Sequence, residues 1–216
     1  SIKYSMPEWI VNLWLPAYGR EGTETLLKGL LSIHPVSLRF STELTEAERE
    51  SLAEKIEKTG VRLQQSRELP YVYLAQNLEN VSELPGFAEG KFHVQDLSSQ
   101  LLCAFVSPQP GERLADVCAA PGGKSFTLAE YMENTGVLDA FDLYKGRVNL
   151  IKKGAERLDL SIIRAAVRDA ATGVCEKQYD RVLCDVPCSG LGVIRRKPEI
   201  RYKKQESFKA VSYTHL

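Results

Sequence analysis

The sequence lacks any apolar stretch long enough to cross a membrane. None of its runs approaches the roughly 18 consecutive apolar residues that a spanning helix needs. No basic segment followed by an apolar one opens the chain, so nothing resembles a secretion signal. We therefore expect no membrane partner.

Paired cysteines are also missing. The cysteines are odd in number and show no CxxC spacing; they are Cys103, Cys118, Cys175, Cys184 and Cys188. This pattern argues against a disulfide scaffold and against a structural zinc site. The three histidines are scattered and give no metal signal. We expect a reducing, cytoplasmic environment and no metal, with Cys103 and Cys184 in apolar core positions.

Net charge is the third absence, because 28 Lys and Arg residues balance 28 Asp and Glu residues. A nucleic-acid role must then rest on a local basic patch. Residues 195–204 supply one, with six basic residues and one acidic residue. The alternative for such a run is an ordinary solvated face. Arg39 is expected to belong to a second nucleic-acid-binding surface.

What is present is the composition of a globular protein, with 44% hydrophobic and 26% charged residues. Ser5–Glu8 is typical of a capping box that opens a helix ended by Gly19, and a second helix is expected near residues 26–31. Thr45–Glu48 is a second capping box, which predicts a helix to about Lys58. Strands are expected at residues 36–41, 61–65 and 71–74. The pattern predicts a small α/β domain over residues 1–80.

Strands and helices alternate in the following part, residues 81–210. Helices are expected after Asp96, from Lys124 and from about 145 to 158; strands are expected at 113–118, 137–142, 162–167 and 181–185. This alternation predicts an α/β fold with a doubly wound, mostly parallel sheet. Such sheets bind ligands at the carboxyl ends of their strands. Three acids, Asp142, Asp169 and Asp185, end or follow the expected strands.

The segment Asp116–Phe126, DVCAAPGGKSF, lies between the first of these strands and its helix. It nearly matches a P-loop, but Cys118 stands where the leading glycine should be. A nucleoside triphosphate would still be compatible if Asp185 bound magnesium. S-adenosylmethionine instead needs a carboxylate for its ribose, and Asp142 lies 19 residues after Gly123. Asp169 suits its adenine and Asp185 its ammonium group, so the spacing favours this second ligand.

Four segments together resemble the Sun/RsmB family of RNA cytosine-5 methyltransferases. They are DVCAAPGGK (116–124), AFDLYKGRVNLI (140–151), RDA (168–170) and DRVLCDVPCSGLGVIRRKP (180–198). The last segment is long and unusual, which makes the resemblance specific. The segments MPEWIVNLWLPAYG and SLRFST resemble the small domain that precedes the catalytic domain in that family. The resemblance therefore covers nearly the whole chain.

The resemblance implies a Rossmann-like class I methyltransferase domain, C-terminally truncated after strand 4, that uses S-adenosylmethionine on 16S ribosomal RNA. The cofactor-binding residues it implies are Cys118, Ala119, Ala120, Pro121, Gly122, Gly123, Lys124, Asp142, Asp169 and Asp185. The catalytic residues are Cys188 and Asp185, and the RNA-binding residues are Arg195, Arg196, Lys197 and Arg201. Transfer RNA is the alternative substrate, and a monomer is expected for the complete protein.

Methylation at cytosine C5 requires a thiolate that adds at C6, because C5 alone is too weak a nucleophile. From the residues alone Cys188 would be that nucleophile. In the family it has an auxiliary role, and the attacking thiolate comes from a later Thr-Cys motif. No Thr-Cys pair occurs in the 216 residues. We therefore expect a truncated, inactive fragment; a non-catalytic RNA-binding module is the remaining alternative. Residues 211–216, VSYTHL, are expected to be non-native, because they can be back-translated to a sequence that resembles the end of a sequencing adaptor.

Overall fold

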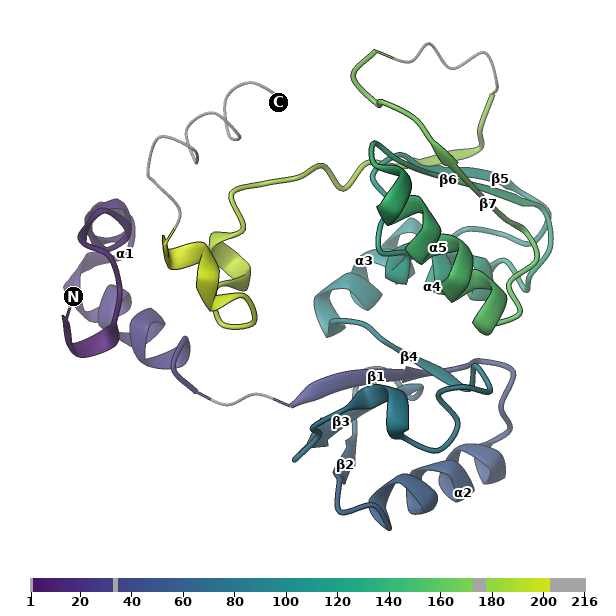
Figure 1. Cartoon of the computed structure of the whole chain (residues 1–216), viewed down its shortest axis with the longest axis horizontal. Helices are drawn as coiled ribbons and strands as arrows, with labels where there is room; N and C mark the ends of the chain where they lie inside the picture. Colours follow the sequence, from purple (N-terminus) through teal and green to yellow (C-terminus); the bar gives the residue numbers. More distant parts are fainter. Residues whose placement is uncertain (1, 33–34, 173–177, 203–216) are drawn as a thin grey trace. The chain divides into compact units, whose positions relative to one another are not determined.

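A computed structural model describes residues 2–32, 35–172 and 178–202 of the chain (Figure 1). The chain forms two compact units. Unit 1 combines Ser1–His34 with Pro187–Leu216, and unit 2 is Pro35–Val186. This division differs from the expected boundary at residue 80, because buried residues of the N-terminal helix cluster with residues that follow the last strand.

The first half of unit 2 is a four-stranded antiparallel sheet with one helix. Its elements are β1 (Val36–Phe40), α2 (Glu46–Glu57), β2 (Arg62–Gln65), β3 (Val72–Gln76) and β4 (Phe92–Val94), after a short 3-10 helix η2 (Val81–Glu83). The strand order is β2-β3-β1-β4, and Leu38 of β1 lies opposite Tyr73 of β3 and Val94 of β4. The predicted capping box is confirmed: Glu48 N donates to Thr45 Oγ1 (3.3 Å), and Thr45 N donates to Glu48 Oε2 (2.8 Å).

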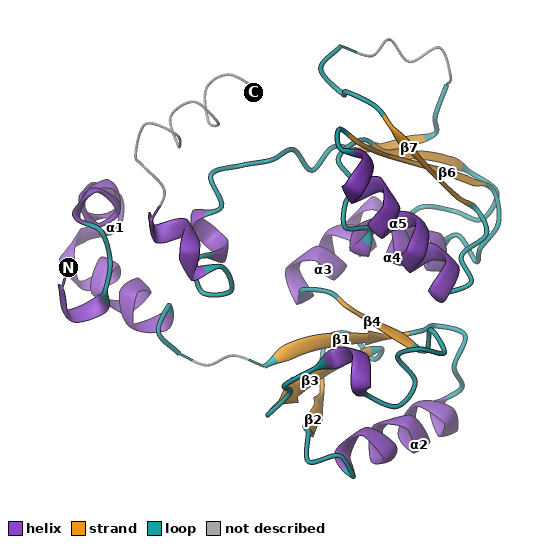
Figure 2. Ribbon diagram, viewed as in Figure 1, coloured by secondary structure: helices purple, strands orange, loops and turns teal. Residues whose placement is uncertain are grey.

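The second half of unit 2 is a parallel sheet packed against helices. Its elements are α3 (Leu97–Val106), β5 (Arg113–Asp116), α4 (Gly123–Tyr131), β6 (Val137–Asp142), α5 (Lys145–Arg157), β7 (Ile163–Val167) and β8 (Arg181–Leu183). The strand order is β7-β6-β5-β8. The chain adds β6 and then β7 on one side of β5 and afterwards β8 on its other side, so the order of connection reverses at β5. Figure 2 shows α4 and α5 on one face of this sheet, and both contact β6 and β7. The predicted α/β fold with a parallel, Rossmann-like sheet is confirmed.

Two arginines, the buried Arg39 and the half-buried Arg157, join the halves of unit 2. Arg39 of β1 has a side chain only 1% exposed, and its Nε lies 2.8 Å from Glu130 Oε2 of α4. Its Nη1 donates to Gln100 Oε1 of α3 at 3.2 Å. Arg157 Nη1 at the end of α5 donates to the carbonyl of Phe87 at 2.6 Å. The expectation of an RNA surface at Arg39 is therefore wrong, because this guanidinium is enclosed by protein.

Unit 1 is built around α1 (Glu8–Gly29) and three 3-10 helices, η1 (Ile2–Tyr4), η3 (Leu191–Val193) and η4 (Pro198–Tyr202). Gly19 interrupts α1 with φ 65°, as predicted, and the helix then resumes. The expected Ser5 cap is wrong: Pro7 occupies the N-cap position and makes no side-chain hydrogen bond. The buried hydrophobic residues described in this unit form one cluster of Tyr4, Met6, Ile10, Leu27, Ile194 and Ile200.

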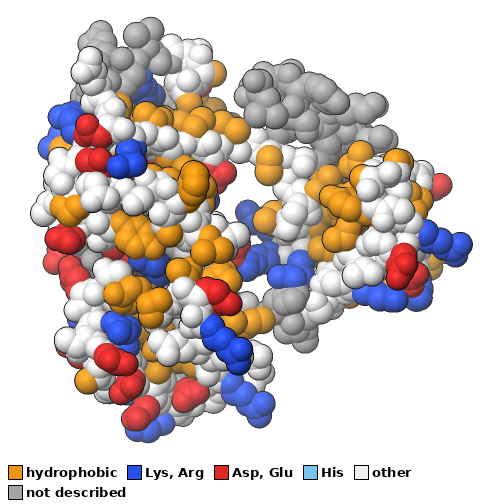
Figure 3. All heavy atoms as spheres, turned by 180° about the vertical axis from the view of Figure 1, so that it is seen from behind, with side chains coloured by type: hydrophobic (Ala, Val, Ile, Leu, Met, Phe, Trp, Pro, Cys, Tyr) orange, Lys and Arg blue, Asp and Glu red, His pale blue; other side chains and the backbone are white. Residues whose placement is uncertain are grey.

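Apolar side chains also reach the surface. In Figure 3 they lie among charged side chains on the face turned to the viewer. Phe105 of α3 is 87% exposed and Val182 of β8 is 60% exposed. Across residues 2–32, 35–172 and 178–202, no helix combines the length and apolar character needed to cross a membrane.

Candidate functional site

The loop between β5 and α4 crosses the carboxyl ends of the neighbouring strands. Val117 N donates to the carbonyl of Leu183 in β8 at 3.0 Å. Two residues later, Ala119 N donates to the carbonyl of Phe141 in β6 at 2.8 Å. The loop then includes a cis Ala120–Pro121 peptide bond. The reversal of strand order thus places it where doubly wound sheets bind their ligands.

Gly122 can only be glycine in this loop. Its φ is 115°, which L side chains rarely adopt, and a Cβ would lie 2.3 Å from Phe126 Cζ. The Phe126 ring fills the space under the loop and also reaches α5, where a Cβ on Gly154 would lie 2.3 Å from Cζ. The Phe126 ring therefore supports the loop backbone at Gly122.

Asp142 at the end of β6 holds the loop. Its side chain is 4% exposed, and Oδ2 accepts a hydrogen bond from Ala120 N at 3.3 Å. Oδ1 accepts one from Tyr144 N at 3.3 Å. Arg147 Nη2 lies 3.5 Å from Asp142 Oδ2 and donates to the Ala120 carbonyl at 2.9 Å. Each carboxylate oxygen can accept a second bond, so Asp142 fits a polyhydroxyl ligand lying over the loop.

Lys124 and Asp185 form an ion pair across the loop. The Nζ–Oδ2 distance is 2.7 Å, and the side chains are 24% and 51% exposed. Asp185 lies two residues beyond β8, close to the strand end as predicted. Because half of its surface is accessible, its carboxylate can also bind a cation supplied by a ligand.

Asp116 supports the loop from within the sheet, a role that the sequence reasoning did not assign. It is 1% exposed and accepts a hydrogen bond from Ser125 Oγ at 2.7 Å. Burial raises the pKa of Asp116 to about 6, against the opposing effect of the Ser125 hydroxyl. The available signal was its position at the end of a strand, which it shares with Asp142.

Asp169 lies two residues beyond β7 and is exposed. Its Oδ1 accepts a hydrogen bond from Ala171 N at 2.9 Å, within its own turn. The adenine contact expected for Asp169 stays a prediction.

The cysteines have different environments. Cys118 is half-buried in the loop, and burial is the main cause that raises the pKa of its thiol. Cys103 is buried, as expected, and burial raises its pKa to about 11. Cys184 is exposed, so the expected core position is wrong: it follows the end of β8. Cys188 is exposed and belongs to unit 1; Cys175 lies outside the described residues.

The basic run belongs to unit 1, where two isoleucines anchor it. Ile194 and Ile200 are 0% and 5% exposed in the cluster with α1. Between them the basic side chains Arg195, Arg196 and Lys197 are exposed. Arg201 is half-buried, and its Nη1 donates to the Ser5 carbonyl at 3.3 Å. Lys203 and Lys204 lie outside the described residues.

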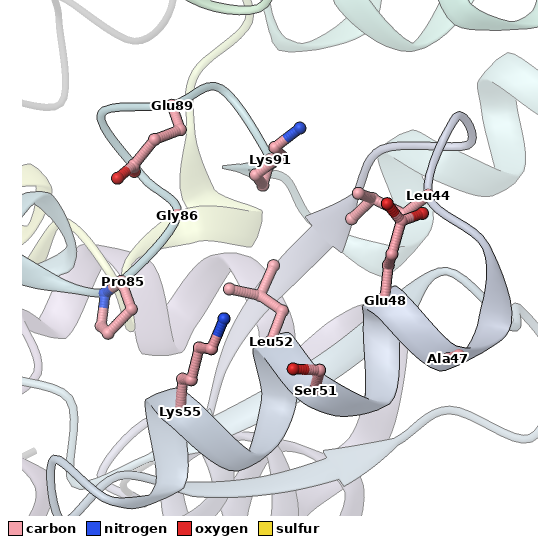
Figure 4. A pocket seen from close by; sticks show the side chains of 10 residues that line it. All are labelled: Leu44, Ala47, Glu48, Ser51, Leu52, Lys55, Pro85, Gly86, Glu89 and Lys91. Carbon is pink, nitrogen blue, oxygen red and sulfur yellow. The ribbon is translucent and has the colours of Figure 1, made fainter.

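A hollow of about 480 Å³ lies between α2 and the loop at residues 85–91 (Figure 4). Leu52 lies at its base, and its charged side chains are Glu48, Glu89, Lys55 and Lys91. These charges balance, so the hollow favours no ligand charge.

Within the described part of the chain, no group of three His, Cys, Asp or Glu side chains could hold a metal ion.

Comparisons with known proteins agree with this geometry. A family model described as "16S rRNA methyltransferase RsmB/F" matches residues 103–214. The "Probable ribosomal RNA small subunit methyltransferase B" of Bacillus subtilis (strain 168) is 36% identical over 204 residues, covering 93% of this chain and 45% of the relative. The Vibrio cholerae "Ribosomal RNA small subunit methyltransferase B" is 32% identical over 206 residues, covering 94% and 46%.

Solved structures share the fold. The crystal structure of PH0851 matches with a TM-score of 0.89 and 30% identity, covering 98% of this chain and 48% of that one. NSun6 from Pyrococcus horikoshii, solved with SFG, matches with a TM-score of 0.81 and 19% identity, covering 95% and 76%. The chain spans about half the length of the curated relatives it matches. It belongs to the RsmB/F family of 16S rRNA methyltransferases.

Proposed function

We propose that the chain is the cofactor-binding part of an S-adenosylmethionine-dependent methyltransferase that acts on C5 of a cytidine in small-subunit ribosomal RNA. The observation that carries the proposal is the loop at residues 117–122, held at the carboxyl ends of the parallel strands by Asp142. Family membership supports this reading over a P-loop NTPase, as does Cys118 at the position of the P-loop glycine.

The residues present fit this cofactor, which supplies a methyl group activated by a sulfonium. The backbone of residues 118–124 would lie along its methionine part, with Gly122 turning the loop at φ 115°. Asp142 would accept hydrogen bonds from the ribose hydroxyls, and Asp169 one from the adenine amino group. Asp185, already paired with Lys124, would bind the ammonium group. A nucleoside triphosphate fits less well, because these carboxylates would repel its phosphates.

For the methyl acceptor, we assign Cys188 an auxiliary role and Asp185 the stabilisation of the cytosine adduct through a ring nitrogen. The attacking thiolate would come from a Thr-Cys motif, which these 216 residues do not contain. The chain alone would then leave cytosine unactivated at C6, and loss of a nucleophile costs several orders of magnitude in rate.

The exposed basic side chains at residues 195–197, with Arg201, would bind RNA phosphates beside the target base. The base must be single-stranded or flipped out to be reached. We place the complete protein in the cytoplasm, as a monomer.

Calorimetry with S-adenosylmethionine tests the cofactor site. Asp142→Ala removes a charged acceptor, and a charge-assisted hydrogen bond contributes about 1.5–3 kcal/mol, so affinity should fall roughly tenfold to hundredfold. Asp180→Ala is the matched control. Asp180 Oδ2 also accepts a backbone hydrogen bond, from Arg113 N at 2.7 Å, but at the amino ends of the strands, away from the loop. Equal affinities for the wild type and both variants would contradict the proposed ribose contact.

Methyl transfer tests the assignment of Cys188. Labelled S-adenosylmethionine and unmodified small-subunit RNA are supplied to this chain and to a full-length relative of the family. We expect label on cytosine only with the full-length protein. Label transferred by this chain alone, and lost in Cys188→Ser, would show that Cys188 is the nucleophile.

A further inference from the structure

The first turn of α4 follows the candidate cofactor loop. It makes hydrogen bonds with side chains from three other parts of unit 2. Gln95 Nε2, between β4 and α3, donates to the Gly123 carbonyl at 3.1 Å. Cys103 Sγ of α3 lies 3.7 Å from the Lys124 carbonyl. Ser125 Oγ donates to Asp116 of β5. Three successive residues of the turn are therefore fixed to separate parts of unit 2.

Gln95 has both ends of its amide engaged. While Nε2 bonds the Gly123 carbonyl, Oε1 accepts a hydrogen bond from Thr127 Oγ1 at 2.6 Å. The same hydroxyl lies 3.2 Å from the Gly123 carbonyl and 3.4 Å from His93 Nε2. Gln95, Thr127 and His93 are 5%, 0% and 3% exposed. A buried amide with both ends satisfied permits one orientation only, so it specifies the position of the groups it bonds.

Gln95 lies between the antiparallel sheet and the candidate cofactor loop. Gln95 directly follows β4 of the antiparallel sheet, and its backbone N donates to the Ser37 carbonyl of β1 at 3.1 Å. Gly123 directly follows Gly122, whose left-handed backbone conformation turns the loop into α4. One side chain thus connects the antiparallel sheet to the last residues of the loop.

We propose that Gln95 is a positioning residue for cofactor binding: its amide, locked by Thr127, sets the orientation of the first turn of α4 and therefore of loop residues 118–124. This inference rests on the proposed function of the loop. Gln95 does not touch the ligand itself; it acts through the Gly123 carbonyl. The small antiparallel sheet is then part of the cofactor site.

Gln95→Glu is the sharpest test, because it keeps the size of the side chain and exchanges its donor for an acceptor. At pH 8 the carboxylate faces the Gly123 carbonyl, and we expect S-adenosylmethionine to bind about tenfold more weakly in calorimetry. Lowering the pH to 5 protonates the new side chain, which can donate again, so affinity should return toward the wild-type value measured at the same pH. A side chain with a merely structural role would not show this recovery.

Thr127→Val removes the hydroxyl that locks Gln95, while Thr127→Ser keeps it. The matched control is Thr135→Val, because Thr135 Oγ1 donates to the Met132 carbonyl at 2.8 Å beyond the other end of α4. We expect faster amide exchange at residues 119–126 and weaker cofactor binding for Thr127→Val only. These readouts remain if Gln95→Glu fails to fold.

The outcomes separate the two proposals. Wild-type exchange and wild-type affinity in both Gln95→Glu and Thr127→Val overturn the inference. If the wild-type chain binds no S-adenosylmethionine, the proposed function fails, and amide exchange in the ligand-free chain still decides whether Gln95 positions the loop.

Discussion

Gly154→Ala should destabilise the protein, although it replaces glycine inside a helix. Such a change usually stabilises a helix by about 0.8–1 kcal/mol. In α5, however, a Cβ on Gly154 would lie 2.3 Å from Phe126 Cζ and 2.8 Å from Cε2. The ring has little room to retreat, because its other side faces Gly122, and its face lies edge to face with His93 at a centroid distance of 5.7 Å.

The size of the effect follows from these two terms. Overpacking a filled core costs about 1–3 kcal/mol, which exceeds or cancels the gain in helix propensity of about 1 kcal/mol. Gly146→Ala in the same helix is the matched control, because its Cβ would meet nothing within 4 Å. The control should stabilise by up to about 1 kcal/mol. The unfolding free energies of the two alanine variants should therefore differ by about 1–3 kcal/mol.

Urea denaturation of both variants measures the difference in unfolding free energy, read from the midpoints at an unchanged m-value. Phe126→Leu supplies the internal check: without the aromatic ring, adding Gly154→Ala should lose its penalty. If Gly154→Ala stabilises as much as Gly146→Ala in the wild-type background, the packing argument is refuted.

Three further predictions concern charge. Burial lowers the pKa of His93 to about 3, so this histidine contributes stability at pH above 6.5 that is lost as pH falls from 6.5 toward 3; His93→Gln should show a flatter decline of the urea midpoint in that window, and an equally steep decline would contradict it. Arg39→Met leaves the buried Glu130 without its partner and should cost about 3–5 kcal/mol at pH 8 but less at pH 6, where Glu130 can take up a proton; a pH-independent loss in denaturation would count against a buried pair. Alanine at residues 195–197 should reduce the slope of RNA affinity against salt by about two to three, whereas an unchanged slope would make the run a solvated face.

Local signals in the sequence predicted the parts of the fold that depend on local physics. The Thr45 capping box involves residues three apart, and the structure contains both of its bonds. The end of β6 at Asp142 and the glycine break at Gly19 were likewise predictable from strand pattern and backbone freedom. Asp142 lies beside the loop because parallel strands bring their carboxyl ends to one edge.

Features that depend on long-range packing were not predictable in the same way. Arg39 has the sequence context of an exposed strand residue, yet it is buried by Glu130, which is 91 residues away. Gln95 gave no signal, because its role arises from partners on α4. The three-residue strand β4 is too short to show alternation, and its pairing with β1 comes from the completed sheet.

The makeup of unit 1 has a consequence for the order of folding during synthesis. A ribosome releases α1 before unit 2, but Ile194 and Ile200, which complete the core around α1, emerge only after all of Pro35–Val186. Domains generally fold as units while the chain is being made. Unit 2 therefore has its complete sequence before unit 1 does, and the apolar face of α1 carrying Ile10 waits for its partners. In that interval the apolar face of α1 is available to chaperones.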